Sequence, residues 1–183
     1  MRAFIAVDLP EALRAALEQG QEGLPGRPVP SENLHLTLAF LGEVAEPVLH
    51  DVHEGLSGLR LTAPELRVSE LDVFGGRRPN LCFAAVAMVP DLEAAQRAVV
   101  RVCRAAGVDL RRERFRPHVT LARFGRELGR REAERLAAKL GVVHLPPERA
   151  ESFSLCRSDL RPEGPVYSML AQYEFTADPE AGI

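Results

Sequence analysis

His35-Leu36-Thr37-Leu38 recurs in the second half of the chain as His118-Val119-Thr120-Leu121, 83 positions further on (118 − 35). In both tetrapeptides polar and apolar residues alternate, which is the period-two pattern of a half-buried β-strand. On such a strand the histidine and the threonine project from one face, while the two apolar residues project from the other. Each motif therefore presents one imidazole and one hydroxyl to the same surface and anchors its strand through an apolar back.

The elements that flank the two motifs come in the same order, which indicates an internal duplication. In the first half, roughly residues 1–79, the pattern predicts a strand at 4–7, a helix at 11–17, a strand at 34–41 ended by Gly42, a helix at 47–59 and a strand at 66–74. In the second half, roughly residues 80–183, it predicts a strand at 81–89, a helix at 91–106, a strand at 115–124, a helix at 127–140 and strands at 152–157 and 166–175. We expect a single α+β domain over residues 1–183, bilobal and internally duplicated, with largely antiparallel sheets around a central cleft and helices on the outside.

Length and composition are those of a globular domain without a membrane segment. The 183 residues are 46% hydrophobic, which is enough to bury a substantial core. No apolar run reaches the roughly 18 residues of a membrane span, and the apolar run near the N-terminus is too short for a signal peptide. We therefore expect a cytoplasmic protein with no membrane partner, and a monomer.

Cys82, Cys103 and Cys156 are odd in number and lie far apart in apolar surroundings. This usage predicts reduced thiols in the core, and it argues against a disulfide framework or a zinc site. His50 and His53 have a helical spacing that could hold a metal, but the sequence marks no third ligand beside them. We expect neither a metal nor a cofactor.

Basic residues gather around the second motif. The formal net charge of the chain is −3, yet the stretch from Arg101 to Arg135 holds eleven Arg against five acidic residues, a local excess of +6. Such an excess attracts a phosphate backbone. Exposed helix faces rich in Arg and Glu produce the same count, so charge alone leaves both explanations open.

Two imidazoles that face each other across a cleft are suited to the cleavage of a phosphodiester. One neutral histidine takes a proton from the attacking water, while the other, protonated, gives a proton to the leaving oxygen. The hydroxyls of Thr37 and Thr120 can donate hydrogen bonds to the non-bridging oxygens, where negative charge gathers. A single such motif is more often structural, but two copies at equivalent places of a repeat predict His35 and His118 as a catalytic pair.

Three longer stretches carry a family resemblance: Arg2–Val7, Asn33–Gly42 and Phe115–Arg123. The chain resembles the two-histidine phosphoesterase superfamily, specifically its bacterial and archaeal 2′-5′ RNA ligase / RNA 2′,3′-cyclic phosphodiesterase branch, over almost its whole length. The resemblance implies catalytic roles for both His-x-Thr pairs and a phosphate contact for Arg123. It also implies a 2′-phosphate as the product.

Arg123 poses a problem of geometry, because strict alternation places it on the face opposite His118. It reaches the cleft only if the strand bends or ends near Ala122, and otherwise it is a surface residue at a strand end. The first motif carries Phe40 at the position that corresponds to Arg123. We therefore expect one lobe to supply more phosphate-binding charge than the other.

Weaker signals lie in Phe74-Gly75-Gly76-Arg77-Arg78, a strand end followed by a basic turn. Phe74 could stack a base, and Arg77, Arg78 and Arg116 could contact phosphate, although an ordinary loop beside a core Phe explains the same residues. We carry these four residues as candidate substrate contacts.

The leading functional hypothesis is hydrolysis of an RNA that ends in a 2′,3′-cyclic phosphate. Formation of a 2′-5′ bond is the reverse type of reaction at the same site, and the sequence does not say which of the two matters in the cell. A phosphodiesterase for a small cyclic nucleotide or for ADP-ribose cyclic phosphate would have the same catalytic centre. A non-catalytic RNA-binding module is a further alternative, but such a module has no need of two acid-base histidines.

Overall fold

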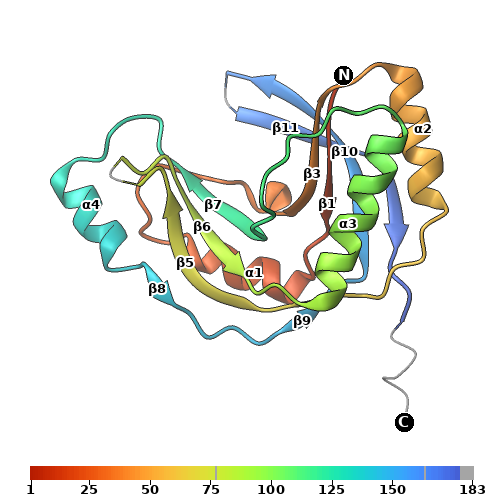
Figure 1. The fold of residues 1–183 in the computed structure, drawn as a ribbon. Helices are drawn as coiled ribbons and strands as arrows, with labels where there is room; N and C mark the ends of the chain where they lie inside the picture. The colour runs from red at the N-terminus through yellow and green to blue at the C-terminus, as the bar shows by residue number, and fades with distance from the viewer. Residues whose placement is uncertain (77, 163, 178–183) are drawn as a thin grey trace, which may run out of the picture.

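In the computed structural model, which describes residues 1–76, 78–162 and 164–177, nine strands form one sheet and helices flank it (Figure 1). The strands of this sheet are β1 (Arg2–Val7), β2 (Arg27–Pro28), β3 (Leu36–Glu43), β5 (Val68–Phe74), β6 (Leu81–Val86), β7 (His118–Arg123), β8 (Gly141–Val142), β10 (Ser152–Arg161) and β11 (Gly164–Glu174). A separate two-stranded sheet consists of β4 (Glu65–Leu66) and β9 (Glu148–Arg149). The helices are α1 (Glu11–Gly20), α2 (Glu46–Ser57), α3 (Pro90–Ala105) and α4 (Arg130–Ala137), with a 3₁₀ turn at Ser31–Asn33.

The large sheet is antiparallel at every strand pair and divides into two lobes. Its order is β11-β10-β1-β3-β7-β6-β5-β8, with β2 paired to β7 off this path. The middle junction between β3 and β7 consists of one residue pair, Leu36 with Val119, whereas the neighbouring strands pair over five residues or more. We call β11-β10-β1-β3 the first lobe and β7-β6-β5-β8 the second lobe. The predicted α+β, bilobal and antiparallel fold is confirmed.

The lobes are not the two halves of the sequence, because the halves exchange their third strands. β5 comes from the first half but pairs with β6, and β10 comes from the second half but pairs with β1. The first helix of each half also crosses over: α1 contacts β7, and α3 packs on β3. Each lobe is therefore completed by elements from the other half of the chain.

Helix α3 illustrates how the pattern of the sequence becomes packing. Pro90 occupies its first turn, where a missing backbone N–H costs nothing, and so ends the preceding extended segment. Leu92, Ala95, Val99 and Cys103 follow at spacings of three and four, and all four are buried. α2 and α3 lie beside the first lobe and α4 lies at the far side of the second (Figure 1), so the predicted helices are on the outside.

Several predicted boundaries shift for local reasons. The strand predicted at 115–124 covers only His118–Arg123, because Pro117 has no N–H to donate to a ladder. The strand predicted at 81–89 ends at Val86, before the proline that starts α3. The helix predicted at 127–140 covers Arg130–Ala137. β3 runs through Gly42 to Glu43, so that glycine does not end the strand.

The three cysteines are free thiols, as predicted. Cys82 and Cys103 are fully buried, and burial raises the pKa of the first to about 11 and of the second to about 12. Cys156 differs from the prediction because it is only half-buried; it pairs with Phe4 across β1 and β10.

Across the described residues, no helix combines the length and the apolar character that a membrane span requires.

Candidate active site

The two motifs lie next to each other at the junction of the lobes. Because β3 and β7 are antiparallel and Leu36 pairs with Val119, His35 is brought toward Thr120 and His118 toward Thr37. Leu36 and Val119 are fully buried, whereas the histidines and threonines are partly exposed. We call the side of the sheet that carries these four polar residues the motif face.

Both imidazoles are oriented in the same way by a backbone carbonyl two residues earlier. Nδ1 of His35 lies 2.7 Å from the carbonyl oxygen of Asn33, and Nδ1 of His118 lies 2.8 Å from that of Arg116. A carbonyl oxygen only accepts hydrogen bonds, so Nδ1 of each ring carries the proton. The Nε2 atoms, which have no partner among the described residues, are left to accept a proton in the neutral ring or to donate one in the charged ring.

Local structure holds the two orienting carbonyls in place. Asn33 closes the 3₁₀ turn, and its side-chain Nδ2 donates to the carbonyl oxygen of Pro165, at the start of β11, over 3.1 Å. On the other side, Pro117 restricts Arg116 to an extended conformation and accepts a hydrogen bond from Val86 N–H at 3.0 Å. Different local interactions therefore fix the two carbonyls, although each imidazole donates to its carbonyl over a similar distance.

Aromatic rings pack against both histidines. The His35 ring lies 4.8 Å from Phe4 and 5.2 Å from Tyr167, measured between ring centroids. The His118 ring lies 5.1 Å from Phe74 and 5.3 Å from Phe83. These rings restrict the imidazoles and remove them from water, which disfavours the charged form.

A β-bulge turns Arg123 onto the motif face. Along the pairing of β6 with β7, Ala122 lies opposite Cys82 and Thr120 lies opposite Phe83, so Leu121 is an extra residue. Leu121 and Ala122 are consequently both buried, and the alternation restarts one residue late, with Arg123 exposed. The condition that the sequence set for Arg123, a bend near Ala122, is met.

The bulge has its own support. The Leu121 carbonyl accepts hydrogen bonds from Val29 N–H and from the Gln21 side chain, each at 2.8 Å. β2 then pairs with β7 at Ala122 and Arg123. Gly26, with φ of +82°, lets this segment approach so closely that a Cβ there would lie 2.6 Å from the Arg123 carbonyl oxygen. The sequence prediction missed Gln21 and Gly26, because their roles depend on contacts with a strand about 100 residues away.

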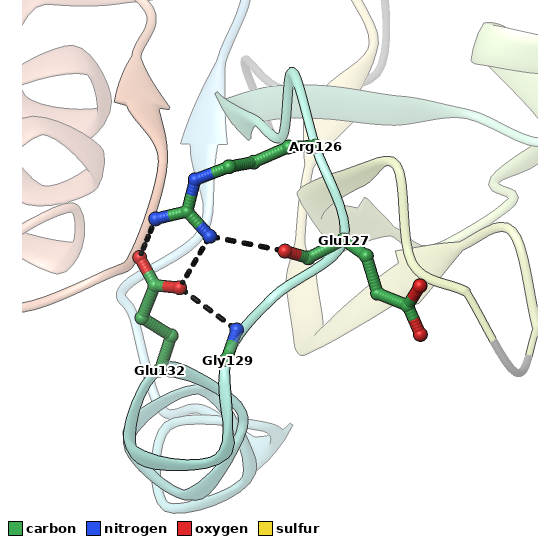
Figure 2. Close-up of polar contacts among 4 residues, drawn as sticks. All are labelled: Arg126, Glu127, Gly129 and Glu132. Atoms are coloured by element: carbon green, nitrogen blue, oxygen red, sulfur yellow. Dashed lines mark hydrogen bonds and ion pairs between the residues drawn. The ribbon is translucent and has the colours of Figure 1, made fainter.

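The chain that follows Arg123 is also held in place. Figure 2 shows Arg126 in a two-armed ion pair with Glu132 of α4, with both nitrogen–oxygen distances at 2.9 Å. Arg126 also donates to the Glu127 carbonyl oxygen, and Glu132 accepts the N–H of Gly129. These hydrogen bonds lower the pKa of the Glu132 carboxyl, and the bond from the Arg126 guanidinium has the largest effect. They tie the loop after β7 to the first turn of α4.

β3 repeats the bulge of β7 with a different residue at its end. Thr37 pairs with Ala6 and Ala39 with Ile5, so Leu38 is the extra residue, and Phe40 then pairs with Phe4. Phe40 therefore comes onto the motif face of the first lobe in the same way as Arg123 does in the second. The two lobes therefore place a cation on one side of the site and an aromatic ring on the other, and the expected difference in phosphate-binding charge stays a prediction.

The surroundings lower the pKa of both histidines below the ordinary value of 6.5. Burial is the main cause for each, because it penalises the imidazolium. The Arg123 guanidinium lowers the pKa of both rings further, and Arg116 adds to the effect at His118. Arg123 therefore lies close enough to both imidazoles to influence them.

Asp8 breaks the symmetry of these charges. Its Oδ2 accepts hydrogen bonds from Ser152 and Ser154 at 2.7 and 2.8 Å and from Gln172 at 3.1 Å. The Asp8 charge raises the pKa of His35, and none of the described carboxylates acts on His118 in the same way. The sequence prediction missed Asp8, although a carboxylate directly after the first strand was a signal that could have marked it.

The predicted phosphate contacts and substrate contacts have different surroundings. The Thr37 and Thr120 hydroxyls have no hydrogen-bond partner among the described residues and are not sealed from solvent. Arg78 lines a cavity of about 290 Å³ together with Val73 and residues of α4, on the opposite side of the sheet from Phe74. Arg77 lies outside the described residues. Roles in substrate binding stay predictions for all of these residues.

Phe74 and Arg116 contact each other and enclose His118. Phe83 stacks on the Phe74 ring at 4.1 Å, and the Arg116 guanidinium lies over the same ring at 5.0 Å. Since a ring has two faces, and stacked Phe83 fills one, Arg116 covers the other. A base can stack on Phe74 only if Arg116 moves. In this arrangement the Phe74 ring packs against His118 and shields one side of the imidazole.

Comparison with known proteins identifies the family. The LigT like Phosphoesterase family matches residues 7–83 and 86–167. The chain belongs to the LigT-like phosphoesterase family. The predicted membership of the two-histidine phosphoesterase superfamily is thereby confirmed.

Relatives of this LigT-like phosphoesterase match it over most of their length. The RNA 2′,3′-cyclic phosphodiesterase of Thermus thermophilus is 36% identical over 97% of this chain and 92% of that protein. The protein of the same name from Aeropyrum pernix is 31% identical over 85% of this chain and 88% of that protein. A crystal structure of a Thermus thermophilus protein aligns with a TM-score of 0.79 at 33% identity, over 96% of this chain and 98% of the other.

Proposed function

We propose that this LigT-like phosphoesterase hydrolyses the 2′,3′-cyclic phosphate at the end of an RNA to a 2′-phosphate, without a metal ion. The observation that carries the proposal is the matched pair of imidazoles, each held through Nδ1–H with its Nε2 free. The names of the relatives, which are RNA 2′,3′-cyclic phosphodiesterases, agree with this activity.

In the proposed step, water attacks phosphorus while the bond from phosphorus to the 3′ oxygen breaks. The Nε2 of one neutral histidine takes a proton from the water, and the Nε2–H of the other histidine gives a proton to the 3′ oxygen. The products are a 2′-phosphate and a 3′-hydroxyl. Thr37, Thr120 and Arg123 stabilise the charge that builds up on the non-bridging oxygens.

We assign the base to His118 and the acid to His35. Arg116 and Arg123 both disfavour the charged form of His118, which suits a group that must be neutral at the start. Asp8 favours the charged form of His35, which suits a group that must be protonated at the start. Formation of a 2′-5′ bond keeps the same assignment, with a 5′-hydroxyl in place of water: His118 takes its proton and His35 protonates the leaving 3′ oxygen.

RNA is the proposed substrate because of the basic loop between α3 and β7. Arg111, Arg112 and Arg114 are exposed there, and among the described residues only Arg111 has an acidic partner, Glu113 at 3.9 Å. The loop leads directly into Arg116 and His118. Its unpaired cations can neutralise phosphates of the chain that precedes the cyclic end.

The test is hydrolysis of a short RNA that ends in a 2′,3′-cyclic phosphate, measured in excess EDTA. We expect a 2′-phosphate product and undiminished activity, and loss of activity that a divalent ion restores would contradict the metal-free mechanism. His35→Ala and His118→Ala should each reduce kcat by about 10²–10⁴-fold while the fold is kept. The double variant should be little worse than either single variant, because the two groups act in one step.

A further inference from the structure

Arg27 is a second cation on the motif face, beside Arg123. It is exposed on β2, and β2 pairs with β7 in the register that sets Arg27 directly opposite Arg123. Residues that lie directly opposite each other in an antiparallel pair project from the same face of the sheet. Because the bulge at Leu121 turns Arg123 onto the motif face, Arg27 lies on that face as well. Two arginines therefore lie side by side at the junction of the lobes.

No acidic side chain balances these two charges. Like charges directly opposite each other destabilise a strand pair, and neither guanidinium forms an ion pair with a carboxylate of the described residues. By contrast Arg2, an exposed cation of the first lobe, lies opposite Glu43 across β1 and β3. A bound anion would relieve the repulsion between Arg27 and Arg123, so this pair of arginines points to an anionic ligand.

The Arg27 guanidinium packs on Gly164, the first residue of β11. A Cβ at Gly164 would lie 3.5 Å from Cζ and Nη1 of Arg27 and 3.6 Å from Nη2. These nearly equal distances place the glycine over the flat face of the guanidinium. The N–H groups lie in the plane of the guanidinium, so Gly164 does not occupy them, and no acceptor among the described residues does. The donors are left to a ligand, in the forked geometry that suits a phosphate.

Arg27 lies further from the imidazoles than Arg123 does. The Arg123 guanidinium lowers the pKa of both histidines, whereas Arg27 affects neither. Yet Gly164, on which Arg27 packs, directly precedes Pro165, and the Pro165 carbonyl accepts the hydrogen bond from Asn33 beside the site. Arg27 is therefore at the rim of the site, one strand outward from Arg123. Arg123 is placed for the phosphate that reacts, and Arg27 is placed for a neighbouring phosphate.

We propose that Arg27 binds the phosphodiester on the 5′ side of the terminal nucleoside, the linkage that joins this nucleoside to the rest of the RNA. The inference rests on the proposed function and adds the substrate class, which is an oligonucleotide rather than a mononucleotide cyclic phosphate. Arg123 neutralises the phosphate that reacts, and Arg27 neutralises the first phosphate that does not. The cations of the loop between α3 and β7 are left for phosphates further along the chain.

The first experiment compares two dinucleotides that differ in one charge. Both end in a 2′,3′-cyclic phosphate and carry a 2′-O-methyl group on the upstream ribose, and the linkage between the nucleosides is either a phosphodiester or an uncharged methylphosphonate. We expect the wild-type protein to favour the charged linkage about three- to tenfold in kcat/KM. Arg27→Gln should remove most of this preference, and Arg27→Lys, which keeps the charge, should retain most of it. Equal kcat/KM values for the two linkages in the wild type would overturn the inference.

Arg2→Gln and Arg101→Gln are the matched controls for Arg27→Gln. Arg2 is exposed on the first lobe and close enough to Tyr167 to lower its pKa, whereas Arg101 is exposed on α3. Neither variant should change the preference for the charged linkage. Loss of the preference in Arg2→Gln but not in Arg27→Gln would place the RNA over the first lobe and would contradict the assignment.

The second experiment measures binding and does not depend on turnover. The ligand is the product dinucleotide, which ends in a 2′-phosphate, and its Kd is determined by calorimetry at several salt concentrations. Each phosphate contact on a single strand contributes about 0.7 to the slope of log Kd against log salt concentration. We expect Arg27→Gln to reduce the slope by about this amount for the phosphodiester ligand and to leave it unchanged for the methylphosphonate ligand. Equal slopes for the phosphodiester ligand in the wild type and in Arg27→Gln would count against the contact.

The outcomes separate this inference from the proposed function. A smaller salt slope in Arg27→Gln supports the phosphate contact even if the wild-type protein hydrolyses neither dinucleotide, a result that defeats the proposed function alone. Hydrolysis of both dinucleotides with equal kcat/KM by the wild type defeats the Arg27 contact alone. Failure of the wild-type protein to bind the product dinucleotide would defeat both.

Discussion

At the scale of single residues, the site consists of two equal imidazoles in unequal surroundings. Both donate through Nδ1 to a carbonyl, yet Asp8 acts on one of them and Arg116 on the other. Arg123 acts on both. The directions of these influences determine how activity should depend on pH.

We expect a bell-shaped dependence of kcat/KM on pH, with its maximum on the acid side of 6.5. The base must be neutral, so activity rises as pH passes its pKa, and the acid must be protonated, so activity falls above its pKa. Burial and Arg123 lower both pKa values below 6.5, so both limbs should lie there. The two limbs belong to the coupled pair and not to either residue alone.

Arg123→Gln should move both limbs of this profile to higher pH, because the guanidinium lowers the pKa of both rings. Substrate binding should weaken as well, because the proposed charged contact of Arg123 with the phosphate would be lost. The measurement is kcat/KM against pH under conditions where chemistry limits the rate. Limbs that stay in place in Arg123→Gln would show that the guanidinium does not act on the pair.

Asp8→Asn tests which histidine is the acid. Its carboxylate raises the pKa of His35, so its removal should lower that pKa and shift one limb to lower pH. If His35 is the acid and has the higher pKa of the coupled pair, the alkaline limb moves further than the acidic limb. A larger movement of the acidic limb would contradict this combination. Asp51→Asn, at an exposed position on α2, is the control and should leave the profile unchanged.

At the scale of elements, the bulges in β3 and β7 create the site. Without the extra residue Leu121, alternation would leave Arg123 on the face opposite His118. The bulge is held from one side by β6 and from the other by the segment of Gln21 to Val29. The position of Arg123 therefore depends on how closely that segment approaches β7.

Gly26→Ala should disturb this approach. The positive φ alone costs about 1–2 kcal/mol for a residue with a Cβ, and the added Cβ would also lie 2.6 Å from both the Arg123 carbonyl oxygen and the Phe124 ring. We expect a lower Tm and a lower kcat/KM than in the wild type, measured by thermal unfolding and by hydrolysis.

Gly23→Ala is the matched control for that variant. Gly23 has a similar φ of +75°, but its nearest neighbour for a Cβ is the end of the Lys139 side chain at 3.7 Å. It should lose stability through the backbone conformation alone and keep its activity. Equal losses in the two variants would mean that contact with β7 is unimportant.

At the scale of the whole molecule, the exchange of third strands makes the two halves interdependent. β5 pairs with β6 and β8 of the second half, and β10 pairs with β1 of the first half. A half on its own would expose unpaired strand edges and the apolar surface that the other half covers. We therefore expect the duplicated sequence to fold as one unit.

We expect the fragments 1–79 and 80–183 to be unfolded when produced separately. Neither should show a cooperative thermal transition by circular dichroism, and mixing the two should restore one. Cooperative unfolding of either fragment alone would show that a half can complete its own lobe.

The sequence by itself determined the elements and their repeated order, and it marked His35 and His118 as the proposed catalytic pair. These features depend on local alternation and helical periodicity, which residues such as His35, Thr37, His118 and Thr120 express within a few positions. The sequence also showed that the role of Arg123 depends on which face of the strand it occupies, but local alternation could not decide the face.

Only the tertiary structure decided what lies around that pair. The bulge at Leu121, the approach of Gly26, the carboxylate of Asp8 and the exposure of Phe40 each depend on a strand far away in the sequence. The pairing of β5 with β6 and of β10 with β1 likewise depends on contacts between distant strands and not on any local sequence pattern. Alternation sets the face of a side chain only while the pairing is regular, and where the register shifts, the contacts between strands decide the face.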